Sequence, residues 1–394
     1  MAGVPTSSGS PLQPASQGRR HLDAAAPPLS AAAREALLGA LDDGWADPRR
    51  LYTEGRRARA LLDGAREAVA GVLGARADEV SFAPSATLAR QIGLRGLLHG
   101  RRRVGRGLVL SAVEHSALLQ TGQWLEGQGG RAVVVGVDRR GRVDLEAWAR
   151  EVAADGVAAA CLQAANGEVG TRQPLGAAAQ ACRDAGVPLL VDAGAVLGRD
   201  RVPAGGDVVV ADARSWAGPG VGVLVVRTGT RWRPDGPSDE NEHGRVPGEV
   251  DVPAALAAAA GLLDAESRRE ARAVRQRALV DQLRAAAAAV PGTEVVGDPD
   301  DRLPHIVTFS SLFVDGEALV HELDRRGFAV ASGSACTAST LEPSHVLAAM
   351  GVLTHGNLRI TLPLDPVESD VEAFCATLPQ VVAQVRAVLG ADRL

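Results

Sequence analysis

The sequence predicts an α/β fold in which a large domain with a mostly parallel sheet is joined to a smaller α+β domain. Between residues 31 and 255, short β-rich runs alternate with segments whose apolar residues recur at helical spacing. That alternation is typical of a parallel sheet covered by helices on both faces. The 394 residues are 46% hydrophobic, so the chain can bury a large core and is long enough for two lobes.

The large domain is predicted to span residues 31–264 and to hold seven strands. A helical segment at residues 57–73 precedes the first strand, and a second helix begins at Thr87. The strands are predicted at 80–82, 108–110, 132–137, 158–162, 188–191, 208–210 and 221–226. Ligands of such sheets bind beyond the carboxyl ends of the strands, so the residues that follow each strand are the candidates for a site.

The small domain is predicted from residues 21–30 and 265–394. An exposed loop at 233–248, rich in Pro, Gly and acidic residues, precedes a long alanine-rich helical stretch at 253–290 that leads out of the large domain. The remaining elements are strands at 294–296, 305–309, 328–331 and 358–361, a helix at 317–326 and a final helix. Residues 1–20 are rich in Ser, Pro, Gly and Gln and are expected to form a disordered tail.

Composition and charge exclude two classes of function. The formal net charge of −5 argues against a nucleic-acid-binding protein, and the basic cluster at residues 101–106 is most simply a solvated loop. No apolar run reaches transmembrane length, and the first 20 residues hold no apolar segment of a signal peptide. We therefore expect a cytoplasmic protein that binds neither nucleic acid nor a membrane.

One of the four cysteines stands in an unusual setting. Cys161, Cys182, Cys336 and Cys375 form no CxxC pair, so their spacing predicts neither a metal site nor a disulfide framework. Cys336 lies in the run Ala-Ser-Gly-Ser-Ala-Cys-Thr after a predicted strand, where small residues leave a thiol accessible. Composition alone leaves a reactive and a structural role equally open for Cys336 and favours a structural role for the other three.

Ordered stretches over most of the chain give it a resemblance to a known family. They read HLDAAAPPLS at 21–30, SATLA at 85–89, VEHSAL at 113–118, NGEVGTRQPL at 166–175, VDAGAVLGR at 191–199, HIVTFSSLFVDGEALVHELDRRGFAVASGSACTAST at 305–340, LEPSHVLAAMG at 341–351 and NLRITL at 357–362. In order and approximate spacing they resemble the cysteine desulfurases of the class V aminotransferase group. The resemblance implies the pyridoxal-phosphate (PLP) fold type I, with a large PLP domain, a small domain with a mobile cysteine loop, and a homodimer.

The resemblance also assigns roles residue by residue. Cys336 matches the cysteine that takes sulfur as a persulfide and passes it to an acceptor protein, and Arg359 matches the arginine that binds the substrate carboxylate. His115 matches the histidine that stacks on the PLP ring, Asp192 the aspartate that pairs with the ring nitrogen, and Thr87 a phosphate-binding hydroxyl. Taken without the resemblance, Thr87 is equally an N-cap, Asp192 a turn cap, His115 a partly buried polar residue and Arg359 a strand-end surface arginine.

The chain departs from the family at positions that hold the cofactor. All 42 Lys+Arg residues are arginine, so no internal aldimine can form and PLP is expected to be noncovalent at most. One alignment register places Ser215 at the lysine position and the other places Arg214 there. Gly167 replaces an expected asparagine and Ala195 an expected glutamine. Glu249 lies near the phosphate-binding segment that the partner subunit donates in the family, where a carboxylate would repel phosphate.

Three functions fit these observations. The chain is a degenerate desulfurase that carries or relays persulfide sulfur on Cys336, a non-catalytic partner or regulator of an active desulfurase, or an enzyme that uses noncovalent PLP without a lysine. The first is favoured. A homodimer is expected, with a heterodimer with an active desulfurase as the alternative. The reactivity of Cys336 distinguishes sulfur relay from a purely structural role.

Overall fold

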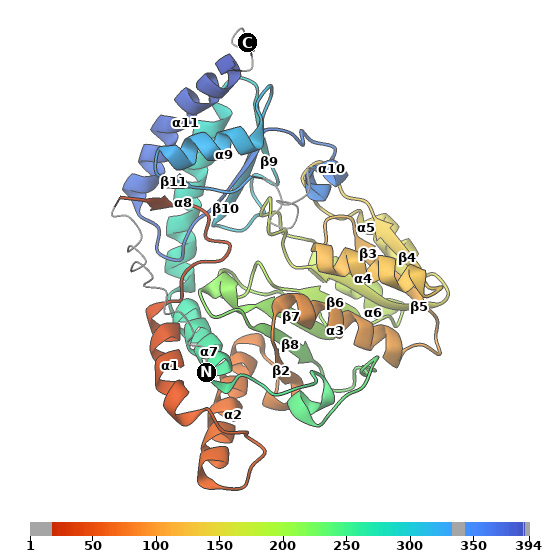
Figure 1. The fold of residues 1–394 in the computed structure, drawn as a ribbon. Helices are drawn as coiled ribbons and strands as arrows, with labels where there is room; N and C mark the ends of the chain where they lie inside the picture. Colours follow the sequence, from red (N-terminus) through yellow and green to blue (C-terminus); the bar gives the residue numbers. More distant parts are fainter. Residues whose placement is uncertain (1–17, 333–342, 389, 391–394) are drawn as a thin grey trace, which may run out of the picture.

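A seven-stranded sheet forms the centre of the computed structural model, which describes residues 18–332, 343–388 and 390 (Figure 1). Its order is β2-β8-β7-β6-β5-β3-β4; the five strands from β7 to β4 are parallel, and β8 is antiparallel to both of its neighbours. The strands are β2 (Val80–Ala83), β3 (Gly107–Ser111), β4 (Arg131–Val135), β5 (Val157–Gln163), β6 (Leu189–Asp192), β7 (Val208–Asp212) and β8 (Gly222–Val226). Each overlaps one of the seven predicted runs, so the prediction of a mostly parallel sheet is confirmed.

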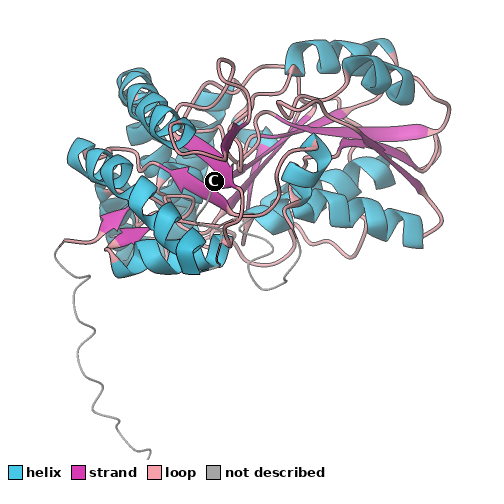
Figure 2. Ribbon diagram, turned by 90° about the horizontal axis from the view of Figure 1, so that it is seen from above, coloured by secondary structure: helices cyan, strands magenta, loops and turns pink. Residues whose placement is uncertain are grey.

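Helices cover both faces of this sheet because neighbouring strand residues point to opposite sides. Leu108 and Leu110 pack on the face covered by α3 and α4, whereas Val109 points into the core on the other face. Figure 2 shows helices on both sides of the strands. The helices are α3 (Ala86–Gly100) and α4 (Ser116–Gly127) on the first face, and α2 (Thr53–Leu73), α5 (Leu145–Val152), α6 (Leu175–Asp184) and α7 (Val252–Ser267) on the second.

A second core surrounds a three-stranded antiparallel sheet of order β12-β10-β9. Phe309 of β10 and Phe374 of α11 are fully buried in it. Its strands are β9 (Thr293–Val296), β10 (Ile306–Ser311) and β12 (Asn357–Thr361), and its helices are α8 (Arg269–Ala288), α9 (Gly316–Arg325) and α11 (Glu368–Val388). The other elements are α1 (Ala31–Asp43), α10 (His345–Met350) and the pair β1 (Arg20–His21) and β11 (Phe328–Ala329), which are parallel.

The helical stretch predicted over residues 253–290 forms two helices. α7 ends at Ser267 and α8 begins at Arg269, with Arg268 between them at φ −118° and ψ 6°. The Ser267 hydroxyl donates to the carbonyl of Asp264 at 2.8 Å, a local bond that competes with regular helix geometry. The break lets α7 pack on α1 and α2 while α8 packs on α11 and β9 (Figure 1).

The predicted domain boundaries at residues 31 and 264 stay a prediction. The predicted tail falls almost wholly at residues 1–17, outside the described part of the chain. Residues 101–104 form a turn, which agrees with the predicted solvated loop. Among the described helices, none is both long and apolar enough to cross a membrane.

A buried carboxylate joins the start of the sheet to the end of β8 and makes stability depend on pH. Glu79 accepts hydrogen bonds from the backbone N–H groups of Thr228 at 2.6 Å and Arg76 at 3.0 Å. Burial opposes ionisation, but these bonds and the nearby Arg227 lower the pKa of Glu79 to about 2. A carboxyl with a lowered folded pKa stabilises the fold above its unfolded pKa, and that stability is lost as the pH falls through the folded pKa.

We therefore expect Glu79→Gln to reduce the free energy of unfolding by about 1.5–3 kcal/mol at pH 7, the usual contribution of hydrogen bonds to a charged group. Urea unfolding measured between pH 7 and pH 2 checks this. The difference from wild type should shrink below a pH of about 4.5, where the unfolded carboxyl gains its proton. A difference that is constant over that range would contradict the assignment.

Candidate active site

A cavity of about 490 Å³ lies at the carboxyl ends of β5, β6 and β7, where the large sheet faces β10, β12 and α10. Its position agrees with the rule that ligands of parallel sheets bind beyond these strand ends. Eight predicted site residues line it: Thr87, His115, Gly167, Asp192, Ala195, Arg214, Ser215 and Arg359. The ninth, Cys336, lies outside the described residues.

Asp192 is the last residue of β6, and its carboxylate is already paired with a cation of the chain. Arg90 of α3 donates from Nε to Oδ2 at 2.6 Å and from Nη2 to Oδ1 at 3.1 Å. The N–H of Gly194 donates to Oδ1 at 2.8 Å. Asp192 therefore also caps a turn, which is the role predicted for it without the family resemblance. Burial alone would raise the pKa of Asp192, but the charge and hydrogen bonds of Arg90 outweigh it and hold the pKa below its ordinary value.

His115 and Thr87 begin the two helices that border the cavity. His115 caps α4, because its Nδ1 accepts the N–H of Ala117 at 3.1 Å and Nε2 therefore carries the proton of the neutral ring. Burial, followed by the charge of Arg90, lowers the pKa of His115 to about 4, so the ring is uncharged at neutral pH. Thr87 lies exposed in the first turn of α3, but the N-cap of that helix is Ser85. The N-cap alternative for Thr87 is therefore wrong.

The position of the family's lysine is filled by side chains that are already engaged. Arg214 lies in a short 3-10 helix that follows β7, is about half exposed, and donates from Nε and Nη2 to Asp212 at 3.3 and 3.1 Å. The hydroxyl of Ser215 donates to the carbonyl of Leu197 at 2.9 Å. Both residues line the cavity, and neither supplies a primary amine.

Gly167 and Ala195 are neighbours in the lining of the cavity. A Cβ atom placed on Gly167 would lie 3.6 Å from the Cβ of Ala195. The family pattern expects amide side chains at both positions. Gly167 and Ala195 lack the two hydrogen-bonding side chains that the family pattern expects in this part of the wall.

Two buried polar side chains of the cavity lining, Arg359 and Glu168, keep unsatisfied atoms within the described part of the chain. Arg359 of β12 is 5% exposed, its Nη2 lies 3.6 Å from Asp23 Oδ1, and its Nε has no hydrogen-bond partner within the described part of the chain. Within the same limits, Oε1 of Glu168 has none, and burial raises the pKa of that carboxyl. The alternative prediction for Arg359, a surface arginine at the end of a strand, is therefore wrong. Arg359 is a buried donor on a cavity wall, able to bind a carboxylate.

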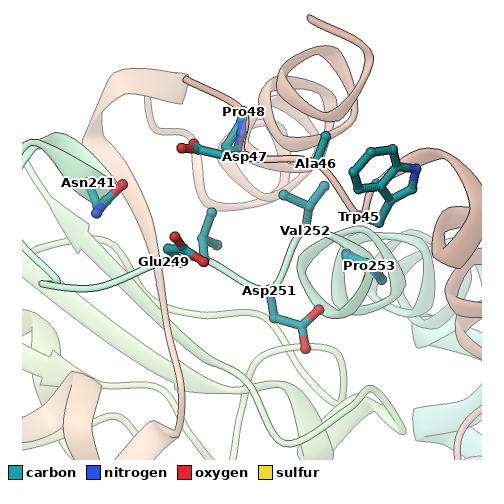
Figure 3. A pocket seen from close by; sticks show the side chains of 11 residues that line it. Trp45, Ala46, Asp47, Pro48, Asn241, Glu249, Asp251, Val252 and Pro253 are labelled. Carbon is teal, nitrogen blue, oxygen red and sulfur yellow. The ribbon is translucent and has the colours of Figure 1, made fainter. Parts of the chain in front are cut away.

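The segment that ends at Glu249 lies at a different, smaller pocket of about 200 Å³ (Figure 3). Glu249 shares the lining of this pocket with two other carboxylates, those of Asp47 and Asp251. Arg245, which begins the segment, donates to the carbonyl of Asp78 at 2.9 Å. Of these three carboxylates, Asp47 is paired with Arg49 at 3.0 Å and with Arg50 at 3.3 Å.

Each of the three described cysteines lies in a setting that raises the pKa of its thiol. Cys161 of β5 and Cys182 of α6 are buried, as predicted, and Cys375 lies half-buried on α11. Burial raises the pKa of Cys161 well above its ordinary value and that of Cys182 to about 12, and it also raises the pKa of Cys375. Since the thiolate is the nucleophile, these three thiols should react slowly at neutral pH.

Comparisons with known proteins identify the family to which the chain belongs. The family Aminotransferase class-V matches residues 21–374. The cysteine desulfurase NifS of Azotobacter vinelandii is 31% identical over 363 residues, 90% of each chain, and a cysteine desulfurase of Cereibacter sphaeroides is 34% identical over 379 residues, 93% of this chain and 96% of the relative. The chain belongs to the class V aminotransferases, in the cysteine desulfurase family. A solved NifS-like protein superposes with a TM-score of 0.86 at 25% identity, covering 93% of this chain and 100% of that one, which confirms the PLP fold type I.

The family depends on PLP, and two of the contacts that it uses for the cofactor differ in this chain. The chain has no lysine for an imine, and the carboxylate of Asp192, which should meet the ring nitrogen, is held by Arg90. His115 and Thr87 remain at the cavity. The cavity thus keeps a buried guanidinium, that of Arg359, and no side chain of the sequence supplies a primary amine to it.

Sequence reasoning missed Arg90 and His305 as cavity residues. Arg90 lies on the buried stripe of α3 with Ala86 and Leu94, at helical spacing. An arginine within an apolar stripe requires a buried anionic or carbonyl partner, and this signal was present in the sequence. His305 precedes β10, lines the cavity and is 3% exposed, and burial holds its pKa well below the ordinary value.

Proposed function

We propose that this chain is a catalytically degenerate cysteine desulfurase homologue that carries or relays persulfide sulfur on Cys336. The observation that carries the proposal is the cavity itself. It keeps the family's place in the fold and its carboxylate-binding arginine, Arg359, but has Arg214 and Ser215 where the imine lysine belongs. Loss of the lysine removes sulfur release from cysteine and leaves sulfur transfer between thiols intact.

The transfer step needs no group beyond the donor and Cys336. The Cys336 thiolate attacks the outer sulfur of a donor persulfide, a new S–S bond forms, the donor's S–S bond breaks, and the donor leaves as a thiolate. No external oxidant or reductant is consumed. The same exchange in reverse passes the sulfur to an acceptor protein.

Two observations support Cys336 as the carrier. The first concerns the described residues on either side of segment 333–342, which contains Cys336. Before the segment, the backbone of Ala331 is hydrogen-bonded to that of Arg359. After it, the side chain of Ser344 is hydrogen-bonded to Glu168. Both neighbours, Arg359 and Glu168, line the cavity. The second observation is that the other three thiols all have raised pKa values.

Cys336 is expected to be the main cysteine that accepts sulfur at neutral pH. The test incubates wild type and Cys336→Ser with a low-molecular-weight persulfide or an active desulfurase and maps the label by mass spectrometry. Cys375→Ser, which removes the half-buried thiol of α11, is the matched control. Label lost in Cys336→Ser and retained in Cys375→Ser supports the relay. Equal labelling of all three proteins would remove it and favour a non-catalytic partner or regulatory subunit.

The partners of this function are proposals as well. We infer a two-fold homodimer, with a heterodimer with an active desulfurase as the alternative, and a separate sulfur-acceptor protein in the cytoplasm. The third function, an enzyme with noncovalent PLP, is disfavoured by the pair that Arg90 makes with Asp192. Size-exclusion chromatography with light scattering tests the dimer.

A further inference from the structure

Arg90 and Asp192 form a buried ion pair in the wall of the cavity. The two side chains are 7% and 5% exposed. Both carboxylate oxygens of Asp192 accept from the guanidinium, in the two-pronged geometry that a planar fork and a carboxylate favour. Arg90 is held by α3 and Asp192 by the end of β6, so neither partner lies on a loop.

Gly194 provides the space for this pair. A Cβ atom at Gly194 would overlap Nη2 of Arg90 and would lie 2.9 Å from Oδ1 of Asp192. Any larger residue would therefore push the guanidinium from the carboxylate. The glycine, the arginine and the aspartate together form one fitted unit at the point where the family's ring nitrogen is expected.

The negative charge of Asp192 is also balanced, by the positive charge of Arg90. In the family pattern the aspartate stabilises a protonated ring nitrogen, which is a cation. Here Arg90 supplies a permanent cation to the same carboxylate. A protonated ring would have to displace the guanidinium or lie against a like charge in a buried site, and both are unfavourable.

We propose that Arg90 excludes PLP from the cavity by taking the place of the cationic ring nitrogen at Asp192. The wild-type cavity is then complete without the cofactor and is left to ligands that need no contact with Asp192. This inference goes beyond sulfur relay and holds whether or not Cys336 carries sulfur. Exclusion of PLP by Arg90 and sulfur relay on Cys336 can therefore be disproved separately.

Binding of pyridoxamine 5′-phosphate tests the proposal, because this form of the cofactor cannot form an imine with the chain's terminal amine. Equilibrium dialysis compares wild type with Arg90→Gln, which keeps an amide donor for Asp192 but removes the charge, and with Arg90→Ala. Arg90→Lys is the matched control that retains the charge. Inorganic phosphate is titrated in parallel to separate binding of the ring from binding of the phosphate group.

Wild type and Arg90→Lys are expected to bind with a Kd above about 1 mM. Arg90→Gln or Arg90→Ala should bind at least about tenfold more tightly, because the like charge is gone and the carboxylate is open. A rise in the melting temperature of Arg90→Gln on adding the compound, absent from wild type, is the second readout. Micromolar binding by wild type would overturn the proposal, and so would equally weak binding by all four proteins.

Discussion

Arg90→Ala is expected to lower the free energy of unfolding by about 3–5 kcal/mol at neutral pH, the usual result of removing one partner of a buried ion pair. The cause is Asp192, which stays buried after the change with its main partner gone. The remaining donor, the N–H of Gly194 at 2.8 Å, does not neutralise the carboxylate. Urea unfolding of wild type and variant measures the difference.

The loss of unfolding free energy in Arg90→Ala should depend on the charge of Asp192 and therefore on pH. Asp192→Asn added to Arg90→Ala removes the uncompensated charge, so the double variant should recover part of the loss. Without Arg90, burial raises the pKa of Asp192, and the loss should shrink as the pH falls and the carboxyl takes up a proton. Arg59→Ala on α2 breaks an exposed pair with Asp63 at 3.7 Å and should have no measurable effect. Equal losses in Arg90→Ala and Arg59→Ala would contradict a buried, essential pair.

Release of sulfide from cysteine is expected to be at least about 10²–10⁴-fold slower than in an active desulfurase even with PLP added, since that range is the usual contribution of a catalytic acid–base group. The missing lysine would also have formed the imine, so the loss should lie at or beyond the upper end. An arginine keeps its proton near neutral pH and cannot substitute for it. Sulfide assays with cysteine and added PLP measure the rate.

Arg214→Lys alone is not expected to restore turnover. It returns an amine to one of the two candidate lysine positions but leaves Arg90 on Asp192. Arg214→Gln, which removes the same ion pair with Asp212 without adding an amine, is the matched control. Sulfide release by Arg214→Lys within tenfold of an active desulfurase would show that Arg90 is no barrier to the cofactor.

Much of the fold could be predicted because its strands are short β-rich runs between amphipathic helices, and all seven appear at the predicted places. The break at Arg268 could not, because no proline or glycine marks it. It arises from packing, since α7 and α8 belong to different cores. The one local signal, Ser267, is common at exposed helix positions and predicts no break on its own.

The sequence predicted which residues line the candidate site, but not which of them are paired with each other. Asp192, His115 and Arg359 were each assigned to the cavity, and each lines it. What the sequence could not supply is that Arg90, 102 positions before Asp192, meets it across the sheet edge. Such a contact depends on how α3 packs against the strands of the sheet. A single sequence carries only the indirect signal of a charged residue on an apolar stripe.

Borohydride reduction tests the central claim, that this desulfurase homologue forms no internal imine, most directly. The purified protein is incubated with PLP, its visible spectrum is recorded, borohydride is added, and the peptides are mapped by mass spectrometry. We expect no protein-bound aldimine band assignable to an internal residue and no pyridoxyl group on any internal side chain, with the terminal amine as the one site where an adduct is allowed. A pyridoxyl adduct on an internal residue, at the cavity or elsewhere, would contradict the central claim.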